Sequence, residues 1–151
     1  MALYPCDLLF VHRDAEGESH RTRIAEIRDN LRFSAPEQVA VCVVPVRMQE
    51  AWLLFNERAI RSAADNPSGR MPLAIPSLDR LEDVANPKEA LYGLLAAASG
   101  LRPGRLRRFS PAPRVHRLAE LIEDFSPLRR LGAFQALEEE LVAILAQRSW
   151  L

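Results

Sequence analysis

Along the chain, the pattern of hydrophobic and polar positions changes from short apolar runs to apolar residues that recur at helical spacing. Residues 7–13 and 39–44 are short runs rich in Leu, Val and Phe, and each predicts a buried strand. Between them, Ile24, Ile27 and Leu31 recur at helical spacing behind the capping residue Ser19, which predicts a helix over 20–33. A strand, a crossover helix and a second strand predict a βαβ unit with parallel strands.

The remainder of the chain is predominantly helical in pattern. We expect helices over 50–64, from Pro87 to about Gly100 with Asn86 as its cap, and over 114–125 and 133–148. Proline-rich connections separate them, with short extended pieces expected at 73–75 and 106–109. The pattern therefore predicts a single α/β domain over residues 1–151, with a small, mostly parallel sheet and a helical C-terminal half.

Two convincing strands are few for a parallel sheet, which needs several strands and cover on both faces. Either weak edge strands complete the sheet, or a partner supplies what is missing. The second alternative predicts an interaction protein that forms a homodimer or completes the sheet of another protein.

The composition narrows the class of protein. Hydrophobic residues make up 48% and charged residues 26%, the balance of a globular protein. No apolar run approaches the roughly 20 residues that cross a bilayer, and no signal peptide is recognisable, so we expect a cytoplasmic protein without a membrane partner.

Cys6 and Cys42 lack the paired spacing of a zinc site and are expected to be reduced core residues.

Positive charge is concentrated in one segment. The chain has 20 basic and 20 acidic residues, yet 101–117 holds six arginines and no acid. Within it, Arg105, Arg107 and Arg108 alternate with apolar residues, as in an exposed basic strand that contacts a nucleic-acid backbone. The alternative is a solvated, charged edge that discourages aggregation.

Two carboxylates follow the first predicted strand. Alternation places His12, Asp14 and Glu16 on one side if the extended geometry persists that far, where they would hold Mg²⁺, or Mn²⁺ because of the histidine. Alternatively, both acids lie in a solvated turn before a helix N-terminus. Glu50 follows the second strand and would lie at the same sheet edge as Asp14, or would simply be an early helix residue.

Three blocks of the chain resemble a Toprim-like family. Residues 8–17 (LLFVHRDAEG) are similar to the strand and acidic pair of Toprim-like proteins. Residues 44–54 (VPVRMQEAWLL) and 86–91 (NPKEAL) are similar to a widespread bacterial Toprim-like family of unknown function, related to the nucleases of overcoming-lysogeny-defect type. The ordered trio spans roughly residues 6–100.

The resemblance implies a small, mostly parallel sheet and Mg²⁺-dependent phosphoryl transfer. Asp14 and Glu16 would match the family's paired acids as metal ligands, and Glu50 its Glu-Ala-Trp block. Such domains usually begin with an earlier strand that ends in a glutamate. Residues 1–6 contain no acid, so the resemblance implies a domain shortened by that strand. The two functions expected are therefore a nuclease-like enzyme and a non-catalytic interaction protein.

Overall fold

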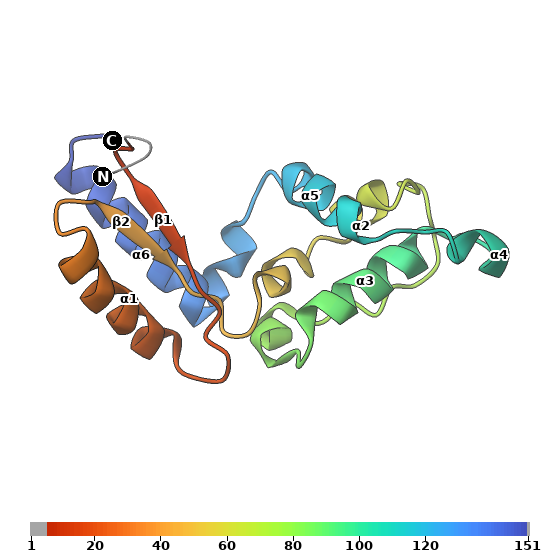
Figure 1. The fold of residues 1–151 in the computed structure, drawn as a ribbon. Coiled ribbons are helices and arrows are strands. Elements are labelled where there is room, and N and C mark those ends of the chain that lie inside the picture. The colour runs from red at the N-terminus through yellow and green to blue at the C-terminus, as the bar shows by residue number, and fades with distance from the viewer. Residues whose placement is uncertain (1–5, 151) are drawn as a thin grey trace. The chain divides into compact units, whose positions relative to one another are not determined.

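The computed structural model describes residues 6–150, which form two compact units. Unit 1 contains residues 6–46 and 131–150, and unit 2 contains Arg47–Arg130. Unit 1 is a mixed α/β structure and unit 2 is helical (Figure 1). The fold class is thus α/β with a small parallel sheet and a largely helical remainder, as the sequence predicts, while the expectation of a single domain stays a prediction.

The βαβ unit predicted near the N-terminus is present in unit 1. It consists of strand β1 (Leu9–His12), helix α1 (His20–Ser34) and strand β2 (Ala40–Val43), and the strands pair in parallel with Val11 opposite Cys42. Ser19 caps α1 by accepting a hydrogen bond from the Thr22 N–H at 3.1 Å. The local signals in the sequence therefore place these three elements correctly.

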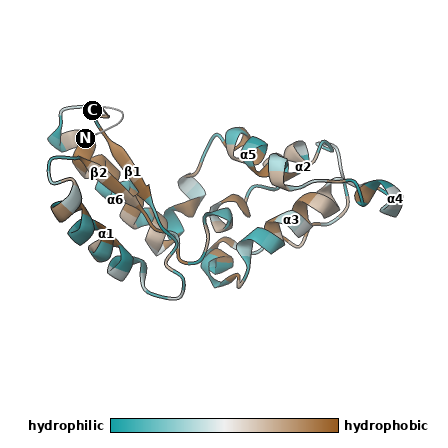
Figure 2. Cartoon of the chain, in the orientation of Figure 1, coloured by the Kyte–Doolittle hydropathy of each residue, from teal (hydrophilic) through white to brown (hydrophobic). Residues whose placement is uncertain are grey.

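The core of unit 1 lies between the sheet and α1. Ala15, Ile27, Cys42 and Val44 are buried together, with Val11, Ile24 and Leu31 packed against them. Figure 2 shows the strands as the hydrophobic part of unit 1 and α1 as largely hydrophilic on its outer surface.

Helix α6 (Gly132–Gln147) packs against β2, whose Val41 is fully buried. The strand β1 is buried on one side only, because Phe10 is 52% exposed while Val11 is half-buried. The prediction of a fully buried first strand is wrong in this respect. Beyond β1 and β2, no strand occurs in residues 6–150, so the weak strands expected at 73–75 and 106–109 are also wrong.

Unit 2 is built from short helices. They are η1 (Gln49–Leu53), α2 (Glu57–Ala63), η2 (Leu78–Asp83), α3 (Pro87–Ala98), α4 (Pro103–Leu106), α5 (Ala112–Leu121) and η3 (Ser126–Arg130). Asn86 caps α3 and Pro87 occupies its first turn, as predicted.

The single helix expected over 50–64 is instead η1 followed by α2. Asn56 accepts a hydrogen bond from the Ala59 N–H at 3.0 Å and starts a new helix there. An asparagine side chain at a helix start competes with helical continuation, which explains the break. No helix in the described part of the chain is long and apolar enough to span a bilayer.

Candidate functional site at the end of strand β1

The backbone beyond β1 continues to pair with the segment beyond β2. The Arg13 N–H donates to the Val43 carbonyl at 3.1 Å, and the Ala15 N–H donates to the Pro45 carbonyl at 2.9 Å. Ala15 is completely buried, and it is flanked by the two acids singled out in the sequence. The carboxyl end of β1 is thus a defined backbone structure that carries Asp14 and Glu16 on either side of an inward-facing alanine.

Glu16 and Gly17 turn the chain into α1. Both have positive φ angles, 53° and 93°, and the Glu18 N–H closes the turn on the Ala15 carbonyl at 3.0 Å. Glycine adopts such angles readily, whereas a glutamate does so rarely. The positive φ of Glu16 ends the extended geometry that Arg13 and Ala15 still follow, so the alternation does not bring Glu16 to the side of His12 and Asp14. Glu16 is exposed.

His12 and Asp14 do lie together. Nε2 of His12 is 3.3 Å from Oδ1 of Asp14, and the two side chains are 45% and 31% exposed. A pair this open to water stabilises the fold by less than about 1 kcal/mol. Its geometry nevertheless holds an imidazole and a carboxylate side by side at the end of a strand.

An arginine on α1 holds the turn in place. Nε of Arg23 donates to the Ala15 carbonyl at 3.3 Å, and Nη1 donates to Glu26 at 2.8 Å. Arg13 donates to the same Glu26 carboxylate at 3.2 Å. The hydrogen bond from Arg23 lowers the pKa of Glu26, and the same bond raises the pKa of Arg23. Neither residue was among the predicted site residues, although the i,i+3 spacing of a helical ion pair is visible in the sequence.

The residues expected to hold a metal offer a limited ligand set. In residues 6–150, no group of three or more His, Cys, Asp or Glu side chains is arranged to hold an ion. His12 and Asp14 supply two adjacent donors. Mg²⁺ characteristically takes one or two protein carboxylates and completes its shell with water and substrate phosphates. This pair supplies one carboxylate, and metal binding here stays a prediction.

Glu50 belongs to unit 2. It lies in the first turn of η1, where a carboxylate interacts favourably with the unsatisfied N–H groups. That is the simpler of the two roles expected for it, and its cooperation with Asp14 stays a prediction.

The three arginines singled out for nucleic-acid contact lie on and beside α4. Arg105 is in this single helical turn, and Arg107 and Arg108 follow it in a turn. The prediction of an extended basic strand is wrong here, because Pro103 starts a helix and the Leu106 N–H bonds back to the Arg102 carbonyl. All three arginines are exposed, as expected.

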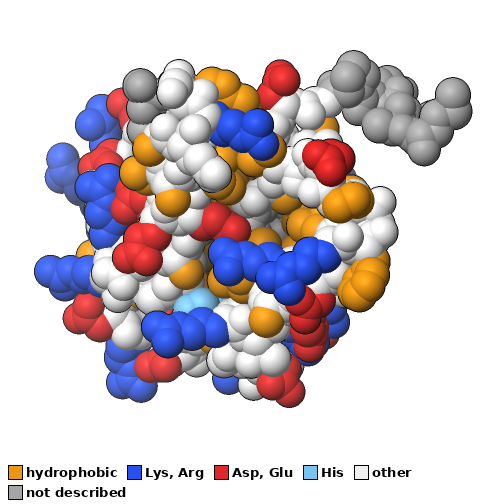
Figure 3. Space-filling view, turned by 90° about the vertical axis from the view of Figure 1, so that its left-hand side faces the viewer, with side chains coloured by type: hydrophobic (Ala, Val, Ile, Leu, Met, Phe, Trp, Pro, Cys, Tyr) orange, Lys and Arg blue, Asp and Glu red, His pale blue; other side chains and the backbone are white. Residues whose placement is uncertain are grey.

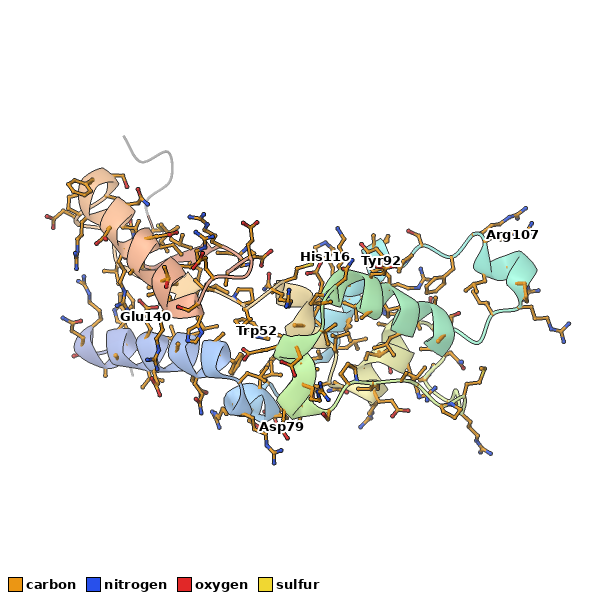
Figure 4. The ribbon with its side chains drawn as sticks, turned by 90° about the horizontal axis from the view of Figure 1, so that it is seen from below. Trp52, Asp79, Tyr92, Arg107, His116 and Glu140 are labelled. Atoms are coloured by element: carbon orange, nitrogen blue, oxygen red, sulfur yellow. The ribbon has the colours of Figure 1, made fainter. Side chains whose placement is uncertain are left out.

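A second polar contact, at the outer edge of β2, was not expected from the sequence. The Cys42 N–H donates to Oε2 of Glu140 at 2.9 Å, and Arg28 donates to Oε1 of the same carboxylate at 3.0 Å. Figure 4 shows Glu140 on the side of α6 that faces α1.

Burial, together with the neighbouring Glu140 carboxylate, raises the pKa of the Cys42 thiol, which agrees with the expected reduced core cysteine. Cys6, in contrast, is exposed, so the prediction that it is a core residue is wrong.

The fold and this site define a small α/β protein whose described residues form a two-stranded parallel sheet. No family model matches the chain, and no curated protein or solved structure matches it significantly. The Toprim-like resemblance therefore stays an expectation that rests on the three sequence blocks.

Proposed function

We propose that this chain is an interaction protein that forms a symmetric homodimer by pairing its β1 strands. The observation that carries the proposal is a difference between the two edges of the sheet. Strand β2 packs against α6, and its outward Cys42 N–H donates to Glu140, whereas the edge of β1 has no neighbouring strand in the described chain. An open strand edge is a template for pairing with another chain.

The register shows which groups the open edge presents. Leu9, Arg13 and Ala15 donate their N–H groups to the β2 side, and Val11 shares their orientation by alternation. The N–H and C=O groups of Phe10 and His12 therefore point to the outer edge.

These groups are self-complementary. In an antiparallel pair of β1 strands centred on Val11, Phe10 of one copy lies opposite His12 of the other. Each such pair exchanges two backbone hydrogen bonds. Two copies thereby satisfy all four outward groups of each strand, and an isologous contact of this kind closes after two subunits. A two-stranded sheet gains stability when it becomes four-stranded.

The side chains favour the same contact. Phe10 is 52% exposed at this edge, and pairing would cover part of its ring against His12 of the second copy. Figure 3 shows arginine and carboxylate side chains on the face that it presents, interspersed with hydrophobic side chains. The exposed Phe10 ring and the outward backbone groups of β1 therefore belong to the same surface.

Light scattering after size-exclusion chromatography tests the proposal. We expect a mass twice the 17.0 kDa of one chain at concentrations of about 100 µM, falling toward one chain on dilution. A constant mass of one chain over that range would contradict it.

A second candidate is metal-dependent phosphoryl transfer at His12 and Asp14. The observation that favours it is the His12–Asp14 contact at the carboxyl end of a parallel strand, which is where open α/β sheets place their sites. A bound Mg²⁺ or Mn²⁺ would polarise a phosphodiester and activate water. Crystals soaked in Mn²⁺ test this candidate, and the lack of an ion within about 2.5 Å of the Asp14 carboxylate would rule it out.

A further inference from the structure

Unit 2 presents a second surface, formed by residues 101–108 and independent of the β1 edge. All eight residues are exposed, and they connect α3 to α5 through the short helix α4 (Figure 1). Four of them are arginines: Arg102, Arg105, Arg107 and Arg108. Figure 4 shows Arg107 on this segment with its side chain directed away from the other helices of unit 2. We call residues 101–108 the arginine loop.

We propose that the arginine loop binds the phosphate backbone of a nucleic acid. The first support is the lack of compensating charge. The sequence has no acid between Glu89 and Glu120, and none of the four arginines forms an ion pair with a described residue. In contrast, Arg114 and Arg117, further along, are both bound to Asp65. The loop therefore concentrates positive charge on a protein whose net charge is zero.

The second support is that the loop is held at both ends. At its start, Gly100 ends α3 with a φ of +63°, and the Asn66 side chain donates to the Ala98 carbonyl at 2.8 Å. At its end, the Arg114 guanidinium lies 4.3 Å from the centre of the Phe109 ring and donates to the Ser110 carbonyl at 2.9 Å. A loop fixed in this way loses less conformational entropy when it binds a ligand.

The third support is the spacing of the charges. Backbone hydrogen bonds link Leu106 to Arg102, Arg107 to Pro103 and Arg108 to Arg105, so the loop is a compact turn of helix. At about 1.5–2 Å per residue, 102–108 extends roughly 9–12 Å, a length over which one DNA strand places about four phosphates. The guanidinium group also matches phosphate oxygens with two parallel hydrogen bonds.

The same features make a membrane surface a poorer partner. An interfacial helix needs a continuous apolar face, whereas α4 is one turn. Its last residue, Leu106, and the preceding Leu101 are only 38% and 36% exposed. An acidic protein would bind to the same arginines. Comparing the affinity for polyglutamate with the affinity for a DNA duplex distinguishes an acidic protein from a nucleic acid.

Fluorescence anisotropy with a labelled 20-base-pair DNA duplex, measured over a series of salt concentrations, tests the proposal. For four phosphate contacts, we expect the logarithm of the association constant to fall with the logarithm of salt with a slope of about −3 to −4. The fourfold variant R102Q/R105Q/R107Q/R108Q should weaken binding at low salt by about 100-fold or more and bring the slope close to zero. Changing the same four arginines to Lys should retain the slope.

A matched control removes four exposed arginines that form no ion pair with a described residue elsewhere on the protein. It is R21Q/R58Q/R70Q/R148Q, which has the same net charge as the loop variant. We expect it to keep most of the affinity, since binding is local to the loop. Equal losses in the two variants, or tighter binding to polyglutamate than to the duplex, would overturn the proposal, as would no binding to the duplex at low salt. The result is independent of the dimer, whose contact lies in unit 1.

Discussion

The backbone N–H of Cys42 in β2 is bonded to the carboxylate of Glu140, a residue 98 positions further along the chain. A carboxylate oxygen occupies the place that the carbonyl of a third strand would take. Arg28 binds the same carboxylate, whose side chain is only 12% exposed. The contact therefore occupies one of the backbone groups through which the outer edge of β2 would pair with another strand.

Replacing Glu140 with alanine should destabilise unit 1. The Cys42 N–H and the Arg28 guanidinium would both lose their acceptor, and we expect the free energy of unfolding to fall by about 1–3 kcal/mol. Urea denaturation measures this. Glu139→Ala, at the exposed neighbouring position, is the control and should change stability by less than about 0.5 kcal/mol. Similar losses in both variants would show that the carboxylate contributes nothing specific.

Replacing Phe10 with lysine should abolish the proposed dimer. The substitution removes apolar area and places a charge on the pairing edge, a device that blocks strand pairing in natural sheets. Light scattering should then give the mass of one chain. Phe33→Lys is the matched control, because Phe33 is 90% exposed at the end of α1, away from the edge, and this variant should remain dimeric. A Phe10→Lys protein that still dimerises would place the interface elsewhere.

Alanine substitutions at two glycines of unit 2 should change the stability of the protein in opposite directions. At Gly100, φ is +63° and an added Cβ would lie 2.9 Å from Nδ2 of Asn66, so Gly100→Ala should cost about 1–2 kcal/mol. At Gly93, inside α3, an added Cβ meets no atom within 4 Å. Gly93→Ala should therefore stabilise the protein by about 0.5–1 kcal/mol. Thermal unfolding of the two variants checks the contrast, and a stabilised Gly100→Ala would contradict it.

The hydrogen bonds from Arg114 and Arg117 to Asp65 should make the stability of the protein decrease at acidic pH. Hydrogen bonds from Arg117 and Arg114 hold the pKa of Asp65 below its ordinary value in the folded protein. The stabilisation that these hydrogen bonds give is fully present above the pKa of about 3.9 that Asp65 has in the unfolded chain. It is lost as the pH falls through the lower pKa that Asp65 has in the folded protein. Since the Asp65 side chain is 53% exposed, we expect Asp65→Asn to cost less than about 1 kcal/mol at pH 7.

Denaturation at several pH values checks this expectation. The difference between wild type and Asp65→Asn should shrink as the pH falls below about 4, because the protonated aspartate then resembles the amide. Asp83→Asn, which alters an exposed pair with Arg80 on η2, serves as the control. A difference that stays constant down to pH 2 would contradict the role of the ionised carboxylate.

Several elements were predictable because their signals are local. The Ser19 cap lies three residues from the N–H that it binds, and Asn86 and Pro87 start α3 by contacts within one turn. The apolar run at 39–44 contains β2. Asn56 carries a cap signal of the same kind, and the break between η1 and α2 could have been predicted from it.

The candidate site was predictable in part. The sequence identified His12 and Asp14, which do lie together, but not the positive φ at Glu16, since it depends on how the turn closes on Ala15 and α1. The helical turn at α4 was misassigned because alternating arginines and apolar residues fit a strand as well as a short helix. Pro103 was the available signal against a strand.

By itself, the sequence determined the α/β class, the parallel βαβ unit and most helix starts, because caps and apolar periodicity act over a few residues. Only the tertiary structure decided that 131–150 packs with residues 6–46, that Glu140 binds the Cys42 N–H and that β1 has no second neighbouring strand among residues 6–150. These outcomes depend on which distant segments pack together. Nothing in the sequence around Glu140 indicates that its carboxylate will accept a hydrogen bond from a backbone N–H of β2.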